Sequence, residues 1–347
     1  MSANRKTFAV CIPAYNRSRY LRQLLDTILL QDFKDFEIII CEDNSPEREE
    51  IATIVREYHA QYPSFIRYYE NEINLGYDAN IRRLIEKSSA HYCFFMGNDD
   101  LMATGALTHL HAVIQRHPGV GVVLRGYCIF EGSPNNILHE LRYYSDEREF
   151  KSGKDSIVLC YRRSGVISGY IVHRDGAFAC ATDKFDGTLY YQMHITASVL
   201  SRRTSVCTPQ ILVLCRANEP PDFGNSEKEK GIYTPGHYTI QARLSMVSGA
   251  LSILEQRDDA RKDGLLDAVK HDYANYFYPF IIDQLHLPIQ EYVKLYRGYW
   301  KMGFGKYPLF HVYCLGCYLL GARRFDKITW AVRKRLGRNV QFGTVPK

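Results

Sequence analysis

The first 130 residues alternate short apolar runs with segments of helical periodicity. The runs Phe8–Ile12, Phe36–Cys41 and His91–Met96 have the length and composition of buried strands. Between them, residues 20–30 repeat leucine and isoleucine at helical spacing, and residues 47–61 follow a turn whose Ser45 can cap a helix. This alternating order predicts an α/β fold with a mostly parallel central sheet.

Polar clusters follow three of the predicted strands. They occupy residues 13–17, 42–45 and 98–100. Ligands of open α/β sheets bind outside the carboxyl ends of the strands, so we expect the three clusters to form one site.

The third cluster ends in two adjacent acids, Asp99 and Asp100. Neighbouring carboxylates repel unless a cation or basic group compensates them, and Mg²⁺ is usually held by one or two carboxylates plus substrate phosphates. An alternative is that one of the pair caps the helix beginning near Thr104. Asp43, at another strand end, favours the metal–diphosphate interpretation because it could receive a nucleoside group, although an Asx-turn would also explain it.

Arg17, in the first polar cluster, could face phosphate or be a solvated residue of a first helical turn.

Four segments resemble, in order and spacing, the successive motifs of family 2 glycosyltransferases. They are CIPAYNR at 11–17, CEDNSPE at 41–47, NLGYDAN at 74–80 and FFMGNDD at 94–100. The last two are most similar to bacterial O-antigen enzymes of the abequosyltransferase-like kind. The resemblance implies the GT-A fold, a Rossmann-like central sheet flanked by helices. It also implies sugar transfer from a nucleotide-diphosphate donor with inversion at the anomeric carbon.

The resemblance also implies roles for the residues that match its motifs. The implied nucleotide-binding residues are Pro13, Ala14, Tyr15, Arg17, Asp43, Asp78, Asn80 and Asp99. Asp100 would be the ligand of a divalent metal, Mg²⁺ or Mn²⁺, with Asp99 as a further candidate.

The base that would deprotonate the acceptor is harder to assign. In many relatives it lies in a Glu-Asp pair before a helix, and Tyr191-Gln192 stand at the corresponding place here. Asp186 is the first candidate, with Asp183 and His194 behind it, and a simple turn at Asp186-Gly187 is the alternative. We expect Asp186→Asn to abolish transfer while nucleotide binding persists.

The chain divides by composition into three parts. Residues 1–217 are expected to form the GT-A catalytic domain, with a nucleotide-sugar half over about 7–130 and an acceptor half over about 131–217. Residues 218–236 are polar and rich in Pro and Gly, which predicts a mobile loop or linker. Residues 237–347 are expected to be a helical C-terminal extension.

The formal charge of +6 is concentrated at the C-terminus. Residues 290–347 hold 12 Lys/Arg and 2 Asp/Glu, which leaves a net charge of −4 for the rest of the chain.

The segment 308–322 lacks Asp, Glu, Lys and Arg, but it is shorter than the about 20 residues that a membrane-spanning helix needs. Arg323, Arg324 and Lys327 follow it, which predicts attachment to an anionic membrane surface. A core helix followed by a solvated basic tail is the alternative. Deleting residues 323–347 is expected to shift the protein to soluble fractions.

These observations predict a metal-dependent, inverting glycosyltransferase (EC 2.4) that transfers a hexosyl or deoxyhexosyl group. Its acceptor would be a lipid-linked saccharide in bacterial O-antigen or capsule synthesis. Residues 1–6 lack the apolar core of a signal peptide, so we expect a cytoplasmic protein, peripheral on the cytoplasmic face of the inner membrane.

Two other functions stay open. A nucleotidyltransferase would more often carry a Gly-rich, basic loop near the first strand. A nucleic-acid-binding protein could use the basic tail, but the acidic body and the lack of a helix-turn-helix, zinc-finger or RNA-binding signature argue against a nucleic-acid partner.

Overall fold

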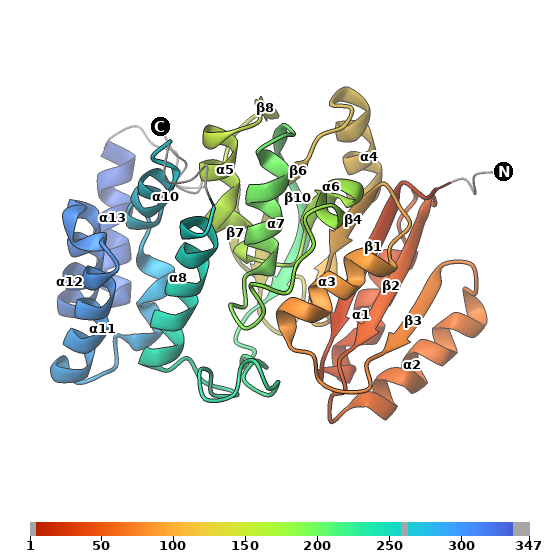
Figure 1. The fold of residues 1–347 in the computed structure, drawn as a ribbon, viewed down its shortest axis with the longest axis horizontal. Helices are drawn as coiled ribbons and strands as arrows, with labels where there is room; N and C mark the ends of the chain where they lie inside the picture. Colours follow the sequence, from red (N-terminus) through yellow and green to blue (C-terminus); the bar gives the residue numbers. More distant parts are fainter. Residues whose placement is uncertain (1–4, 258–262, 336–347) are drawn as a thin grey trace.

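A ten-stranded mixed sheet is the centre of the computed structural model, which describes residues 5–257 and 263–335 (Figure 1). The main path of the sheet is β3-β2-β1-β4-β9-β6-β10-β5, with β7 beside β6 and β8 beside β10. The strands are β1 (Phe8–Ala14), β2 (Phe36–Glu42), β3 (Ile66–Glu70), β4 (Tyr92–Phe95), β5 (Leu101–Met102), β6 (Val122–Phe130), β7 (Ile137–Leu141), β8 (Arg148–Phe150), β9 (Tyr170–His173) and β10 (Ser205–Arg216).

The N-terminal half of the sheet is parallel, as predicted. β1 pairs in parallel with β2 and β4, and β2 pairs in parallel with β3. β9 is inserted antiparallel between β4 and β6, and β10 then runs parallel to β6. Both faces are covered, which explains why the strands are continuously apolar. Phe8 and Val10 of β1 belong to one hydrophobic cluster, and Ala9 and Cys11 belong to the cluster on the opposite face.

Helices cover both faces of this sheet (Figure 1). The N-terminal helices fall close to the predicted ranges, but the predicted cap at Ser45 is wrong. Helix α2 begins at Arg48 after Glu47, and the buried Ser45 hydroxyl, which a cap would use as its acceptor, has no hydrogen-bond partner among the described residues. The helices are α1 (Ser18–Leu29), α2 (Arg48–Gln61), α3 (Tyr77–Lys87), α4 (Ala106–Arg116), α5 (Lys154–Tyr161), α6 (Arg174–Phe178), α7 (Tyr191–Leu200), α8 (Ile240–Glu255), α10 (Leu265–Ala274), α11 (Ile289–Lys301), α12 (Pro308–Leu320) and α13 (Ala322–Arg335).

The C-terminal helices share a hydrophobic core with the sheet. One cluster of buried side chains runs from β1 through α5 and α7 to α8, α10, α11 and α12. A buried ion pair joins the two regions, because Asp272 of α10 accepts from Arg163 at 2.9 and 3.0 Å and from Arg162 at 3.0 Å. The sequence-based division of the chain at 217 and 236 stays a prediction. Within the described ranges, no helix is both long and apolar enough to cross a bilayer.

His173, which ends β9, should make the fold sensitive to acid. Its Nδ1 accepts the Gly176 N–H at 3.2 Å and so caps α6, and burial lowers the pKa of the imidazole to about 4. The unfolded chain therefore binds a proton at this histidine more readily, and the contribution of His173 to stability should fall as pH drops from 6.5 towards 4. His173→Asn keeps a capping acceptor without this titration, so its urea midpoint should rise relative to that of the wild type as the pH falls through that window.

The control is His139→Asn on β7, which removes an exposed histidine. If His173→Asn and His139→Asn lose stability in acid as steeply as the wild type, the role assigned to His173 is wrong.

Candidate functional site

A cavity of about 360 Å³ opens at the carboxyl ends of β1, β2 and β4. The three polar clusters of the sequence meet there, as expected for an open α/β sheet. Seven of the predicted site residues line it, namely Pro13, Tyr15, Arg17, Asp43, Asn80, Asp99 and Asp100. The opposite wall comes from later in the chain, and includes Leu189, Tyr190, Asp222, Phe223, Glu229, Tyr238, Arg243 and Met246.

Asp43 is buried at the end of β2 and organises the loop before α3. Its Oδ1 accepts from Asn71 Nδ2 at 2.7 Å and from the Leu75 N–H at 2.9 Å, and its Oδ2 accepts from the Gly76 N–H at 3.0 Å. Burial raises the pKa of Asp43 to about 6, although these three donors act in the other direction. Asn80 is fixed nearby, because its Nδ2 donates to the Cys41 carbonyl at 3.0 Å.

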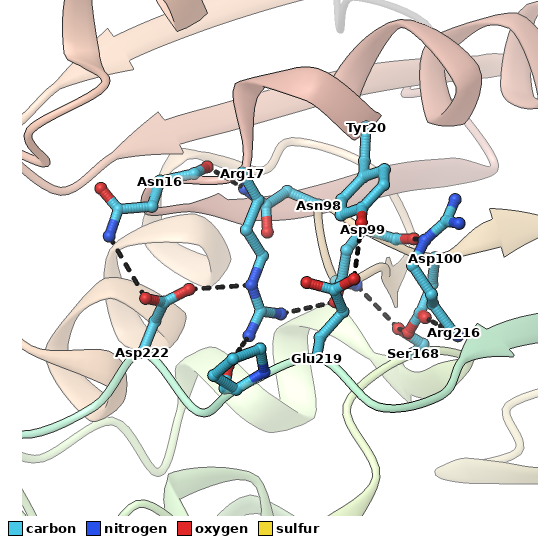
Figure 2. A network of polar contacts seen from close by, with 12 residues as sticks. Asn16, Arg17, Tyr20, Asn98, Asp99, Asp100, Ser168, Arg216, Glu219 and Asp222 are labelled. Atoms are coloured by element: carbon cyan, nitrogen blue, oxygen red, sulfur yellow. Dashed lines mark hydrogen bonds and ion pairs between the residues drawn. The ribbon is translucent and has the colours of Figure 1, made fainter. Parts of the chain in front are cut away.

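Arg17 is held by two carboxylates from distant parts of the chain (Figure 2). Its Nη1 donates to Asp99 Oδ2 at 2.5 Å, its Nε lies 2.8 Å from Asp222 Oδ2, and its Nη2 donates to the Pro220 carbonyl at 2.5 Å. The backbone of Asn16 and Arg17 has φ of 51° and 59°, a left-handed conformation that arginine rarely adopts. This strained turn at the end of β1 aims the guanidinium into the cavity.

Asp100 is bound from two further strands (Figure 2). Ser168, just before β9, donates its hydroxyl to Asp100 Oδ2, and the N–H of Arg216 in β10 donates to Oδ1 at 2.7 Å. Burial, followed by the charge of Asp99, raises the pKa of Asp100 to about 7. Burial also raises the pKa of Asp99, against the opposing effect of Arg17. The pair is therefore short of positive charge in this arrangement.

Two predicted nucleotide-binding residues do not line the cavity. Ala14 is fully buried in β1. Asp78 points into the protein, where its carboxylate accepts the N–H groups of Leu189 at 2.9 Å and Tyr191 at 2.8 Å. Asp78 therefore fixes the start of α7.

The three candidate bases also lie outside the cavity lining. Asp186 is bound at both oxygens by Arg82, at 2.5 and 3.0 Å. His194 Nε2 is 2.8 Å from the Cys180 carbonyl, and Asp183 is exposed. Gln192, which stands in place of the family acid, is buried.

The sequence interpretation missed several polar residues around the cavity. Arg216 follows an apolar run at a strand end, so the signal used for Asp43 and Asp99 could have found it. Asp222 and Glu229 lie in the stretch interpreted as a linker, where sequence alone gave no sign of contact. Glu229 accepts the N–H groups of Tyr77 and Gly224 at 2.9 and 2.8 Å, and so joins this stretch to the start of α3.

Comparison with known proteins shows which protein family part of this chain resembles. Residues 9–177 match the family described as glycosyl transferase family 2. This range is just under half of the chain, and over it the chain resembles that family. The predicted resemblance is thereby confirmed, because the matched range contains all four motifs.

Two curated relatives of this chain are bacterial glycosyltransferases by their names. The abequosyltransferase RfbV of Salmonella typhimurium is 31% identical over 104 residues, which are 30% of this chain and 31% of that protein. The GalNAc(5)-diNAcBac-PP-undecaprenol beta-1,3-glucosyltransferase of Campylobacter jejuni is 29% identical over 128 residues, 37% of this chain and 40% of that protein. The chain thus aligns with less than half of either relative.

Solved structures extend the likeness to almost the whole chain. The family 2 segment and the C-terminal helices superpose on Staphylococcus aureus TarS 1-349 in complex with UDP-GlcNAc, with a TM-score of 0.62 at 15% identity, covering 96% of this chain and 93% of that one. The mannosyltransferase PcManGT of Pyrobaculum calidifontis, in complex with GDP-Man and Mn²⁺, gives 0.52 at 13% identity, covering 97% and 89%. The predicted GT-A fold with a C-terminal helical extension is confirmed.

The contacts of Asp186 predict that its substitution will lower stability. Asp186→Asn leaves the mostly buried Arg82 without its carboxylate and should reduce the free energy of unfolding by roughly 1–3 kcal/mol. The thermal midpoint measures this, with Asp183→Asn as a matched control because Asp183 is an exposed neighbour.

Sugar transfer by the folded Asp186→Asn protein then decides the catalytic question. Near-normal turnover would remove Asp186 from the role of base. Lost turnover with an unchanged midpoint would contradict the structural role and support the catalytic one.

Proposed function

We propose that this protein is a glycosyltransferase that moves a sugar from a nucleotide-diphosphate donor to a saccharide acceptor. The observation that carries the proposal is the meeting of Arg17, Asp99 and Asp100 with Asp43 in one cavity at the strand ends. An acidic pair and an arginine are the groups that a metal-bound diphosphate requires, and Asp43 lies where a nucleoside could bind.

In this proposal the donor competes for Arg17. The guanidinium pairs with Asp99 and Asp222, and a diphosphate would take the place of Asp222. Pro13 and Tyr15 would line the base and ribose, with Asp43 accepting a hydrogen bond from the nucleoside. Asn80 stays a predicted neighbour of the nucleotide, whereas Asp78 would act by holding α7.

A divalent metal fits the acidic pair. Burial raises the pKa of both carboxyls, the charge of Asp99 raises that of Asp100 further, and a cation would stabilise the two ionised groups. In the ranges that the structure describes, no three His, Cys, Asp or Glu side chains group as a ligand set, so Asp100 and Asp99 would be the protein ligands and phosphate and water would supply the rest. The metal would neutralise the leaving nucleoside diphosphate.

Inversion requires a base for the acceptor hydroxyl. Asp186 remains the sequence-based candidate. Because it also pairs with Arg82, the test above measures both the stability and the turnover of Asp186→Asn. Asp222 is a second candidate because it lines the cavity and would be released from Arg17 when a diphosphate binds.

The acceptor would be a lipid-linked saccharide of a bacterial surface polysaccharide. The names of the two relatives support this class, one through abequose transfer and the other through an undecaprenol-diphosphate saccharide. The reaction would then take place on the cytoplasmic face of the inner membrane, with a hexosyl or deoxyhexosyl donor.

Calorimetric titration with UDP, GDP, CDP and dTDP, each with and without Mn²⁺, tests the proposal. We expect one diphosphate to bind and Mn²⁺ to strengthen its binding. Asp100→Asn should weaken metal-dependent binding by about tenfold or more, since a charged ligand of the metal is lost. Asp155→Asn, an exposed acid at the start of α5, is the control. Binding of none of the four diphosphates, or binding of nucleic acid instead, would contradict the proposal.

The competition for Arg17 predicts an unusual gain of affinity. Asp222→Asn removes a carboxylate that holds the guanidinium, so the diphosphate should bind about twofold to fivefold more tightly. Glu219→Gln is the matched control, because Glu219 lies in the same segment but pairs with Arg19 and Tyr20. Weaker binding by Asp222→Asn would mean that Asp222 belongs to the bound state.

A further inference from the structure

Helix α12 is apolar on all sides but is only half covered by protein. Its 13 residues include no Asp, Glu, Lys or Arg. Phe310, Tyr313, Cys314 and Cys317 face the core. A helix that is hydrophobic all round is normally buried completely or in contact with lipid.

The outward side of α12 carries five exposed large apolar side chains, which we call the α12 face. Their spacing places them on one side of the helix. Leu319 is the extreme case, at 78% exposure. The α12 face consists of Leu309, Val312, Leu315, Leu319 and Leu320.

Basic residues are fixed directly beside this face. The sequence turns at Gly321 into α13, where Arg323, Arg324 and Lys327 are exposed. The one acid of α13, Asp326, accepts a hydrogen bond from Tyr278 at 3.0 Å.

The packing of α13 on α12 makes this arrangement specific. Phe325 is buried against Tyr313, with ring centroids 5.6 Å apart. Gly316 admits the Phe325 ring, since a Cβ there would lie 2.7 Å from it. Deleting residues 323–347 would remove this core contact, so point variants are the better test.

An aromatic residue lies at the border of the α12 face. Trp300 of α11 is 52% exposed, and its ring centroid lies 5.2 Å from that of His311 in α12. Tryptophan is enriched at the level of lipid headgroups. An apolar strip with basic residues at one end and tryptophan at its border matches the chemistry of an anionic bilayer surface.

We propose that the α12 face, with Arg323, Arg324 and Lys327, docks on an anionic phospholipid bilayer. The helix would lie in the plane of the interface, because 13 residues reach about 20 Å and the hydrocarbon core is about 30 Å thick. This surface deepens the proposed function by placing the enzyme where lipid-linked acceptors are. Its test needs no sugar transfer, so either proposal can fail alone.

Vesicle flotation of the full-length protein tests the surface. We expect binding to vesicles of phosphatidylcholine with phosphatidylglycerol, and weaker binding to phosphatidylcholine alone. Leu315→Glu with Leu319→Glu should reduce binding by about tenfold or more, because two leucines that would enter the bilayer are replaced by charged side chains. Leu30→Glu is the matched control, since Leu30 has the same 78% exposure at the end of α1.

Two further measurements test whether charge contributes to lipid binding and whether the α12 face instead binds a second copy of the chain. Arg323→Glu with Lys327→Glu should abolish the preference for phosphatidylglycerol and its sensitivity to salt. Circular dichroism and calorimetric nucleotide binding should match the wild type in every variant, and Leu319→Gln replaces the double variant if that one fails to fold. Unchanged flotation with the α12 face altered would overturn the proposal. So would a dimer that Leu319→Gln dissociates without any lipid binding, which would make the face a contact between copies of the chain.

Discussion

The packing of two adjacent carboxylates after β4, with Asp99 buried and Asp100 half-buried, is the constraint around which the site is arranged. Asp99 and Asp100 cannot both stay ionised out of water unless positive charge and hydrogen-bond donors surround them. Those groups come from strands that are neighbours in space and not in sequence. Arg17 follows β1, Ser168 precedes β9 and Arg216 ends β10. The insertion of β9 beside β4 brings Ser168 to the acids, so the mixed pairing of the sheet and the electrostatics of the site depend on each other.

The N-terminal half of the fold and most of the cavity wall at the ends of β1, β2 and β4 could be predicted from sequence because their signals are local. Strands covered on both faces are continuous apolar runs, and residues at their ends point to one edge of the sheet. Asp78 shows the limit of such motifs. It lies two residues from Asn80 on α3, and positions two apart on a helix face different ways. The motif places both residues on one segment, but only the fold decides which of them faces the cavity.

Ion pairs between distant segments were the other part that sequence could not supply. Asp186 looks like a free acid before a helix until Arg82, 104 residues away, is seen to bind it. Asp222 similarly lies in a polar, Pro-rich stretch whose composition indicates a linker, yet it pairs with Arg17 across 205 positions of sequence. Such contacts depend on how loops are placed over the sheet, and no period or local composition encodes them.

The left-handed backbone at Arg17 has different consequences under selection for stability and under selection for binding. Glycine adopts this conformation freely, whereas a side chain there costs about 1–2 kcal/mol. A library screened for heat resistance alone would set this cost against the ion pairs with Asp99 and Asp222, so it should accept glycine at position 17 only where those acids are also replaced. A library screened for ligand capture should keep the arginine. Position 17 marks where this chain trades part of its folding stability for a cation directed into the cavity.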